Sequence, residues 1–172
     1  LDTIDLLLIH RPDPLMDADE MAHAFSRLRE SGKVKYFGVS NFTPSQFQLL
    51  HSRFPLVTNQ VECSLIQTQA LEDGSFDLCQ QLKMSPMIWS ALGGGALFER
   101  KTEQSQRVLT ALTKIASELQ TTPATIAIAW LLRLPVKPLI LTGSGRVEAL
   151  REAVRATELV LTRPQWFDLW RA

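Results

Sequence analysis

The sequence predicts an α/β fold in which parallel strands alternate with helices along one chain. Five short apolar runs recur through its 172 residues, at residues 5–10, 35–39, 56–61, 87–91 and 138–142. Because these runs are continuously apolar rather than alternating, they are typical of parallel strands that are covered on both faces. The segments between them carry apolar residues at helical spacing, so helices separate the strands. Each β-α step takes roughly thirty residues, the length of one crossover unit.

Helix signals mark the first two segments between the runs, and the third is a shorter helical candidate. Asp17 opens a capping-box sequence that predicts the start of a helix, and Gly32 predicts its end. Thr43 is the predicted N-cap of the second helix, and Pro44 is its first residue. A shorter helix is expected over residues 75–83.

The second half of the chain carries three further helix patterns. The first closes near Thr121 and has an apolar stripe formed by Val108, Leu112, Ile115 and Leu119. The next is expected over residues 124–134, after a Thr-Pro start signal. The third follows the fifth strand over residues 145–157 and has an apolar side formed by Val147, Leu150 and Val154.

Composition narrows the class of protein. Apolar residues make up 45 % of the chain and charged residues 21 %, as in ordinary globular proteins. Eighteen Lys and Arg residues balance eighteen Asp and Glu residues, so there is no overall basic charge to attract nucleic acid or an anionic membrane. The two cysteines, Cys63 and Cys79, fit neither a zinc pattern nor a disulfide framework. Because no apolar run approaches the ~20 residues of a membrane span and the first residues lack signal-peptide features, we expect a soluble cytoplasmic protein without nucleic-acid or membrane partners.

Two architectures are compatible with repeated β-α units, an open doubly wound sheet and a (β/α)8 barrel. The dinucleotide-binding version of the open sheet needs G-x-G-x-x-G after an early strand, and this fingerprint is absent. The chain also has no P-loop, H-E-x-x-H or C-x-x-C motif, and no metal site is expected. A barrel typically takes ~250 residues, so five strands in 172 residues would form an incomplete one.

Polar, aromatic or glycine residues follow the end of each predicted strand. They are HRPD at residues 10–13, SNF at 40–42, NQVE at 59–62, WSALGGG at 89–95 and TGSGR at 142–146. Parallel barrels build their active sites at this carboxyl-end face. The repetition therefore indicates a site assembled from several strand ends.

At these positions the sequence resembles the aldo-keto reductases. The matching segments are LIHRPD (residues 8–13), GKVKYFGVSNF (32–42), NQVE (59–62) and WSALG (89–93), in the order and spacing of the family. The resemblance covers essentially the whole chain, and the second segment is highly specific. The triple glycine at residues 93–95 and the SGR sequence at 144–146 look most like a bacterial oxidoreductase subgroup of that family.

The resemblance implies both a fold and an activity. The fold would be a partial (β/α)8 TIM barrel comprising strands 4 to 8 of the aldo-keto reductase fold, in an N-terminally incomplete domain over residues 1–172. The activity would be NADPH-dependent reduction of an aldehyde or ketone by hydride transfer. Of the family's catalytic Asp, Tyr, Lys and His, only the His is represented, at His10, and the single tyrosine, Tyr36, does not match the catalytic position. The isolated fragment is expected to be inactive, because it lacks the acid that protonates the developing alkoxide.

The resemblance also implies which side chains contact substrate and nicotinamide. His10 would hydrogen-bond the substrate carbonyl and orient it; the alternative is a strand-end histidine bonded to backbone. Ser40, Asn41 and Gln60 match the family's contacts to the nicotinamide carboxamide, and their alternative role is N-capping or loop bonding. Trp89 stands where the family stacks an aromatic ring on the nicotinamide, and a buried core Trp is the alternative.

Phosphate contacts form a second group of implied residues. Ser90, Leu92 and Gly93 would present backbone amides to the cofactor pyrophosphate, with glycine allowing close approach, and a flexible loop is the alternative. Ser144 and Arg146 open the last β-α helix, where helix-end amides and a guanidinium favour the adenosine 2′-phosphate of NADPH.

Three interpretations of function stay open at this level. The chain is an aldo-keto reductase or the C-terminal part of one; it is a non-catalytic NADP(H)-binding or interaction module on the same barrel; or it is an incomplete chain without activity of its own. An upstream Asp, Tyr and Lys in family spacing would favour the enzyme over the other two.

Overall fold

A computed structural model of the chain describes residues 2–172; Leu1 lies outside the described residues. The chain divides into two compact units, each of which is described by itself. Unit 1 comprises Leu1–Val61 and Ala70–Met87, and unit 2 comprises Glu62–Gln69 and Ile88–Ala172. Two strands, β3 (Asn59–Glu62) and β4 (Met87–Trp89), contain the points at which the chain passes from one unit to the other.

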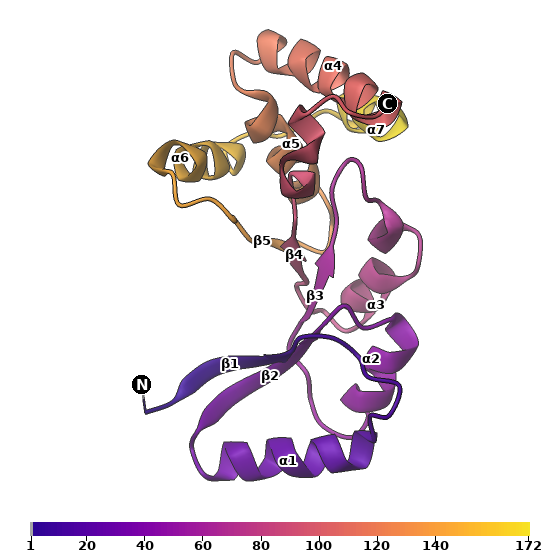
Figure 1. Ribbon diagram of the computed structural model, residues 1–172, viewed down its shortest axis with the longest axis vertical. Coiled ribbons are helices and arrows are strands. Elements are labelled where there is room, and N and C mark those ends of the chain that lie inside the picture. The colour runs from indigo at the N-terminus through magenta and orange to yellow at the C-terminus, as the bar shows by residue number, and fades with distance from the viewer. Residues whose placement is uncertain (1) are drawn as a thin grey trace. The chain divides into compact units, whose positions relative to one another are not determined.

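Unit 1 is built on parallel strands and three covering helices (Figure 1). Its elements are β1 (Ile4–Ile9), α1 (Ala18–Glu30), β2 (Val34–Ser40), α2 (Pro44–His51), the first residues of β3, and α3 (Ser75–Gln81). β1 pairs in parallel with β2 from Ile4↔Val34 to Ile9↔Val39. β2 pairs in parallel with β3 at Val39↔Asn59 and Ser40↔Gln60. Strands that neighbour each other in the chain are thus neighbours in the sheet, as repeated β-α units require.

The predicted helix signals act as expected in unit 1. The Asp17 side chain accepts the backbone N–H groups of Asp19 and Glu20 at the start of α1. Gly32, just after α1, has φ +70°, a backbone conformation that glycine adopts readily. Thr43 caps α2 in a reciprocal capping box with Gln46. These local contacts confirm the predicted starts of α1 and α2.

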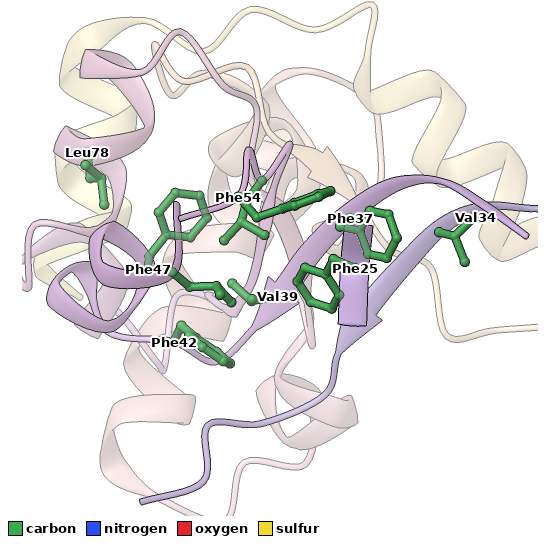
Figure 2. Packing of buried hydrophobic residues seen from close by; sticks show 10 residues of the cluster. Phe25, Val34, Phe37, Val39, Phe42, Phe47, Phe54 and Leu78 are labelled. Carbon is green, nitrogen blue, oxygen red and sulfur yellow. The ribbon is translucent and has the colours of Figure 1, made fainter. Parts of the chain in front are cut away.

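An aromatic cluster forms the centre of the unit 1 core (Figure 2). Phe37 on β2 stacks on Phe25 of α1 with ring centroids 4.5 Å apart, and Phe54, after α2, meets both rings edge-on. All three side chains are buried. They join β2, α1 and the segment that follows α2 through contacts that only a folded β-α-β unit brings together.

β1 differs from its prediction. A strand covered on both faces was expected over residues 5–10, whereas β1 has no fully buried residue and Ile4 is 47 % exposed. Leu7 and Ile9 pack against the core, and Leu6 and Leu8 lie on the opposite face of the strand. The prediction of full burial is wrong for the described structure, because an apolar run does not specify which neighbours cover it.

Unit 2 combines short strand segments with four α-helices. Its elements are the end of β4, the 3₁₀ turns of η2 (Gly93–Phe98), α4 (Glu103–Glu118), α5 (Pro123–Leu132), β5 (Leu139–Ile140), α6 (Val147–Ala156) and α7 (Arg163–Arg171). The Leu141 N–H donates to the Ile88 carbonyl oxygen (2.9 Å), which joins β4 to the end of β5. A further short 3₁₀ turn, η1 (Gln69–Leu71), lies at the boundary between the units.

The core of unit 2 surrounds α5. Seven consecutive residues of this helix, Thr125 to Leu131, are buried, and α4, α6 and β5 all contact it. α4 begins at Glu103, five residues before its predicted apolar stripe, because Thr102 and Ser105 form a capping box there. β5 is shorter than the expected residues 138–142. α6 leaves its apolar side, Val147, Leu150 and Val154, 46–63 % exposed.

The length and apolar character of the helices can be compared with what a membrane-spanning segment needs. Within residues 2–172, no helix combines the length and the apolar character that a membrane crossing requires.

Candidate active site

Ser40, Asn41 and Gln60 lie together in unit 1, where the end of β2 pairs with the first residues of β3. The Ser40 hydroxyl donates to the Gln60 carbonyl oxygen (2.9 Å) and lies 3.4 Å from Gln60 Oε1. The Asn41 side-chain nitrogen donates to the Ser40 hydroxyl (3.0 Å), and the Asn41 backbone N–H donates to the Gln60 carbonyl oxygen (2.9 Å). The three residues expected at the nicotinamide thus form one hydrogen-bonded cluster.

His10 joins this cluster through its backbone. The Asn41 side-chain nitrogen donates to the His10 carbonyl oxygen (3.2 Å), so the ends of β1 and β2 are linked. The imidazole of His10 is exposed and makes no hydrogen bond to another described residue. The alternative role, a side chain bonded to backbone, is therefore not what the described structure contains. An exposed imidazole is able to donate a hydrogen bond to a ligand oxygen.

The members of the cluster differ in exposure. Ser40 is 2 % exposed, so its hydroxyl serves mainly to connect Asn41 and Gln60. Asn41 and Gln60 are half-buried and reach solvent. Within residues 2–172, the side-chain nitrogen of Gln60 donates to no partner. A carboxamide ligand needs both donors and acceptors, and this set of amides and hydroxyl supplies both.

One further residue beside the cluster was missed as a site residue in the sequence analysis. Asn59, which precedes Gln60, is buried and donates from Nδ2 to the Phe42 carbonyl oxygen (2.8 Å). The NQVE motif contains Asn59, but its contact is with a turn seventeen residues earlier in the chain. Spacing within the motif could not have indicated that partner.

In unit 2, Trp89 ends β4 and leads into a tight glycine-containing turn. Trp89 is half-buried, and its carbonyl oxygen accepts the Cys63 N–H (3.4 Å). Ser90 has φ +52°, an uncommon backbone conformation for a residue with a side chain. The Gly93 N–H donates to the Ser90 carbonyl oxygen (2.7 Å), so this amide, expected at the pyrophosphate, bonds within the turn.

A side chain at Gly93 would have to displace that of Ile66. The φ of Gly93 is +60°, and an added Cβ would lie 2.5 Å from Ile66 Cδ1. The glycine therefore brings the turn at residues 90–93 close to Ile66. Leu92, also expected at the pyrophosphate, is half-buried and accepts the Gly95 N–H at its carbonyl oxygen (3.1 Å).

Ser144 and Arg146 lie at the start of α6. The Arg146 backbone N–H donates to the Ser144 hydroxyl (3.2 Å), and Arg146 is the N-cap of the helix. No side chain caps the first amides of α6, and the exposed Arg146 guanidinium makes no ion pair with another described residue. Helix-end amides and an unpaired guanidinium fit an anionic group such as a phosphate.

A metal site would need several metal-binding side chains close together. In the described part of the chain, no three His, Cys, Asp or Glu side chains are close enough to hold a metal ion.

Comparisons with known proteins place these features in a family. A family model described as the aldo/keto reductase family matches residues 1–170. The chain is 53 % identical to Oxidoreductase YdhF of Escherichia coli over 99 % of its own length and 58 % of that protein. It is 44 % identical to a 6-dehydroglucose reductase of Agrobacterium fabrum over 98 % of its length and 57 % of that protein. The chain thus spans less than two thirds of the curated relatives that it matches.

A solved structure agrees with the sequence matches. A thermostable aldo-keto reductase, Tm1743, crystallised with the inhibitor epalrestat, superimposes with a TM-score of 0.85 at 30 % identity. The superposition covers 99 % of this chain and 60 % of that one. The family resemblance indicated by the motifs, including its bacterial subgroup, is confirmed by these matches.

Proposed function

The chain belongs to the aldo/keto reductase family of oxidoreductases, and from this membership we propose that it supports NADPH-dependent reduction of an aldehyde or ketone by hydride transfer. The substrate class is a small carbonyl compound. A domain spanning residues 1–172 and a partial barrel of strands 4 to 8 are parts of the proposal. A cytoplasmic location is also proposed; within residues 2–172 Cys63 and Cys79 are not joined in a disulfide, which is compatible with a reducing compartment.

The observation that carries the proposal is the hydrogen-bonded cluster formed where the ends of β1 and β2 meet the first residues of β3. Ser40, Asn41 and Gln60 hold one another through bonds of 2.9–3.4 Å, and Asn41 reaches the His10 backbone. Side-chain amides with both donors and acceptors suit a carboxamide. The exposed imidazole belongs to His10, the residue whose carbonyl oxygen accepts the Asn41 bond. We propose that Asn41 and Gln60 contact the nicotinamide carboxamide and that Ser40 contributes to the same contact.

The remaining cofactor contacts are proposed for unit 2. Trp89 would lie against the nicotinamide ring, and the turn formed by Ser90, Leu92 and Gly93 would receive the pyrophosphate. Arg146, with Ser144, would pair with the 2′-phosphate at the uncapped start of α6. When bound, NADPH supplies the hydride that reduces the carbonyl carbon.

His10 is the proposed catalytic residue of this chain. Its imidazole would donate a hydrogen bond to the substrate carbonyl oxygen, which orients the carbonyl and stabilises negative charge as it develops on that oxygen. The oxygen must also receive a proton, and the family assigns that step to a tyrosine. Tyr36, the single tyrosine, lies early in β2, is 58 % exposed and does not match that position. We therefore propose that these 172 residues alone do not turn over substrate.

A second candidate is a non-catalytic NADP(H)-binding or interaction module on the same scaffold. It is favoured by the balance of the proposed roles, since nine residues are proposed to contact the cofactor and His10 is the single proposed catalytic residue. Both candidates predict that residues 1–172 bind NADPH, and the reductase predicts turnover only in a protein that also carries the remaining catalytic residues.

The test compares cofactor binding with turnover. Fluorescence titration should show that the protein binds NADPH more tightly than NADH, and an absence of binding would overturn both candidates. NADPH oxidation is then followed with a panel of aldehydes and ketones, in a protein that carries the remaining catalytic residues. That panel includes 6-dehydroglucose, because the Agrobacterium relative is named for it. The encoded sequence before Leu1 decides between the candidates: Asp, Tyr and Lys at family spacing support the reductase, and another sequence supports the binding module.

A further inference from the structure

Asn59 is a buried polar residue beside the nicotinamide cluster to which the proposed function assigns no role. It is the first residue of β3 and is 5 % exposed. Its side-chain nitrogen donates to the Phe42 carbonyl oxygen (2.8 Å), whereas its Oδ1 is buried with no hydrogen-bond partner among the described residues. A buried oxygen without a partner destabilises the fold. What the Asn59 amide supplies is therefore the bond to Phe42.

Phe42 is held from two directions. Its ring is 2 % exposed and packs into the unit 1 core, where Figure 2 shows it near Val39 and Phe47. Its carbonyl oxygen accepts the Asn59 bond. The residue just before it, Asn41, has φ +61°, a conformation that costs free energy for a residue with a side chain and is tolerated best by Asn and Asp.

Two successive residues of β3 thus fix the turn that follows β2. The Gln60 carbonyl oxygen accepts the N–H of Asn41 (2.9 Å), and Asn59 donates to the carbonyl of Phe42 (2.8 Å). The backbone of Asn41 is held on both sides. Its side chain is then directed at the Ser40 hydroxyl (3.0 Å) and the His10 carbonyl oxygen (3.2 Å).

We propose that Asn59 is a positioning residue that holds Asn41, and through it Ser40, in the orientation that receives the nicotinamide carboxamide. The proposal rests on the proposed function for the identity of the ligand. Asn59 itself touches neither cofactor nor substrate in this scheme. Its contribution is to keep the positive φ of Asn41 populated before the ligand binds, which lowers the ordering required on binding.

Two variants remove the donor in different ways. Asn59→Asp keeps the shape but replaces the donor with an acceptor, so the Phe42 carbonyl faces an oxygen. Asn59→Leu keeps a similar branched shape and also removes the unpartnered Oδ1, so it tests the donor without adding a buried charge. Both variants should lose about three- to tenfold in NADPH affinity, the effect of one net hydrogen bond. If Asn59→Asp does not fold, Asn59→Leu decides.

Thr58→Val is the matched control. Thr58 is also buried, and its hydroxyl donates to the Ser85 carbonyl oxygen (3.0 Å), away from the turn at residues 41 and 42. Valine keeps the shape and removes one buried hydrogen bond, so the melting temperature should fall while NADPH affinity stays at the wild-type value. A purely structural role for Asn59 would instead make NADPH affinity follow melting temperature across all three variants.

Hydrogen exchange by mass spectrometry gives a readout that needs no cofactor. The Asn41 amide, bonded to Gln60, should exchange about three- to tenfold faster in both Asn59 variants and unchanged in Thr58→Val. Wild-type exchange in both Asn59 variants overturns the proposal. If wild-type protein does not bind NADPH, the proposed function fails, and the exchange result still decides whether Asn59 holds Asn41.

Discussion

Trp130 of α5 and Trp166 of α7 each donate the indole N–H to the other's backbone carbonyl oxygen, at 3.1 and 3.0 Å. Their rings stack with centroids 5.0 Å apart and an interplanar angle of 12°. The two tryptophans are 36 residues apart in the chain, and their contact joins α5 to α7. Both indole N–H donors, which would be costly to bury without a partner, are therefore satisfied by backbone carbonyl oxygens.

Trp166→Phe should destabilise the fold by about 1–3 kcal/mol, because it removes one indole donor and part of the ring stack. Urea unfolding measures the change. Trp170→Phe is the control, since Trp170 is 39 % exposed and tilts against Trp166 rather than stacking on it. Equal losses in the two variants would show that the reciprocal bonds add no stability.

Gly93→Ala should destabilise unit 2 by about 2–4 kcal/mol, from the strain of a positive φ and from the displacement of Ile66. Gly94→Ala is the matched control. Gly94 has nearly the same φ, +61°, but an added Cβ would find its nearest neighbour at 4.0 Å. The control should therefore lose only the strain, about 1–2 kcal/mol. Denaturant midpoints compare the two, and an equal loss would exclude the close approach to Ile66 as a cause.

Arg146→Ala should weaken NADPH binding by about ten- to 150-fold, the value of one hydrogen bond to a charged group, and should change NADH binding little. The reason is that only NADPH carries the 2′-phosphate that the guanidinium would meet at the start of α6. Fluorescence titration with both cofactors measures the effect. Equal weakening of NADH and NADPH would reject the phosphate contact.

His10→Ala should lower kcat/KM for carbonyl reduction by about 10²–10³-fold in a protein that carries the remaining catalytic residues. NADPH affinity should not change, because the imidazole would face the substrate. Steady-state kinetics and a parallel cofactor titration separate the two quantities. Loss of NADPH binding with normal turnover of the bound cofactor would contradict the catalytic role.

Burial raises the pKa of the Cys79 thiol to about 11 from its ordinary value of 9.0. In the unfolded chain this thiol loses its proton near pH 9, whereas the folded chain retains it until about pH 11. The contribution of Cys79 to stability is therefore complete below pH 9 and declines as the pH rises through this window.

Urea unfolding of wild type and Cys79→Ala tests this dependence between pH 7 and pH 10. The difference in free energy of unfolding between the two proteins should be constant up to about pH 9 and should then shrink. Other groups that titrate in the same range cancel in the difference. A constant difference up to pH 10 would show that the thiol ionises as readily in the folded chain.

Local signals predicted much of the fold. Asp17, Thr43 and Thr122 were predicted as helix starts from residues within one turn, and each accepts an amide at the helix start in the structure. Burial of β1 was predicted wrongly, since it depends on which strands and helices lie beside it. The strand predicted over residues 138–142 was too long for the same reason, since β5 has two residues.

The candidate site shows the same division. Motif matching selected Ser40, Asn41 and Gln60, and the structure brings them into one cluster. Motif matching could not show that Ser40 is almost fully buried or that the Gly93 N–H bonds within its own turn. Both depend on backbone geometry that residue types do not encode individually.

The register of β1 against β2 bears on the order in which unit 1 folds. Paired residues are thirty apart at every position, from Ile4↔Val34 to Ile9↔Val39. The first pair to form closes a loop at an entropic cost of about 3 kcal/mol, and the following pairs close no further loop. Pairing of these strands is therefore cooperative, with one slow step followed by rapid zippering. Formation of α1 inside the loop shortens the distance that must be closed before the two strands meet.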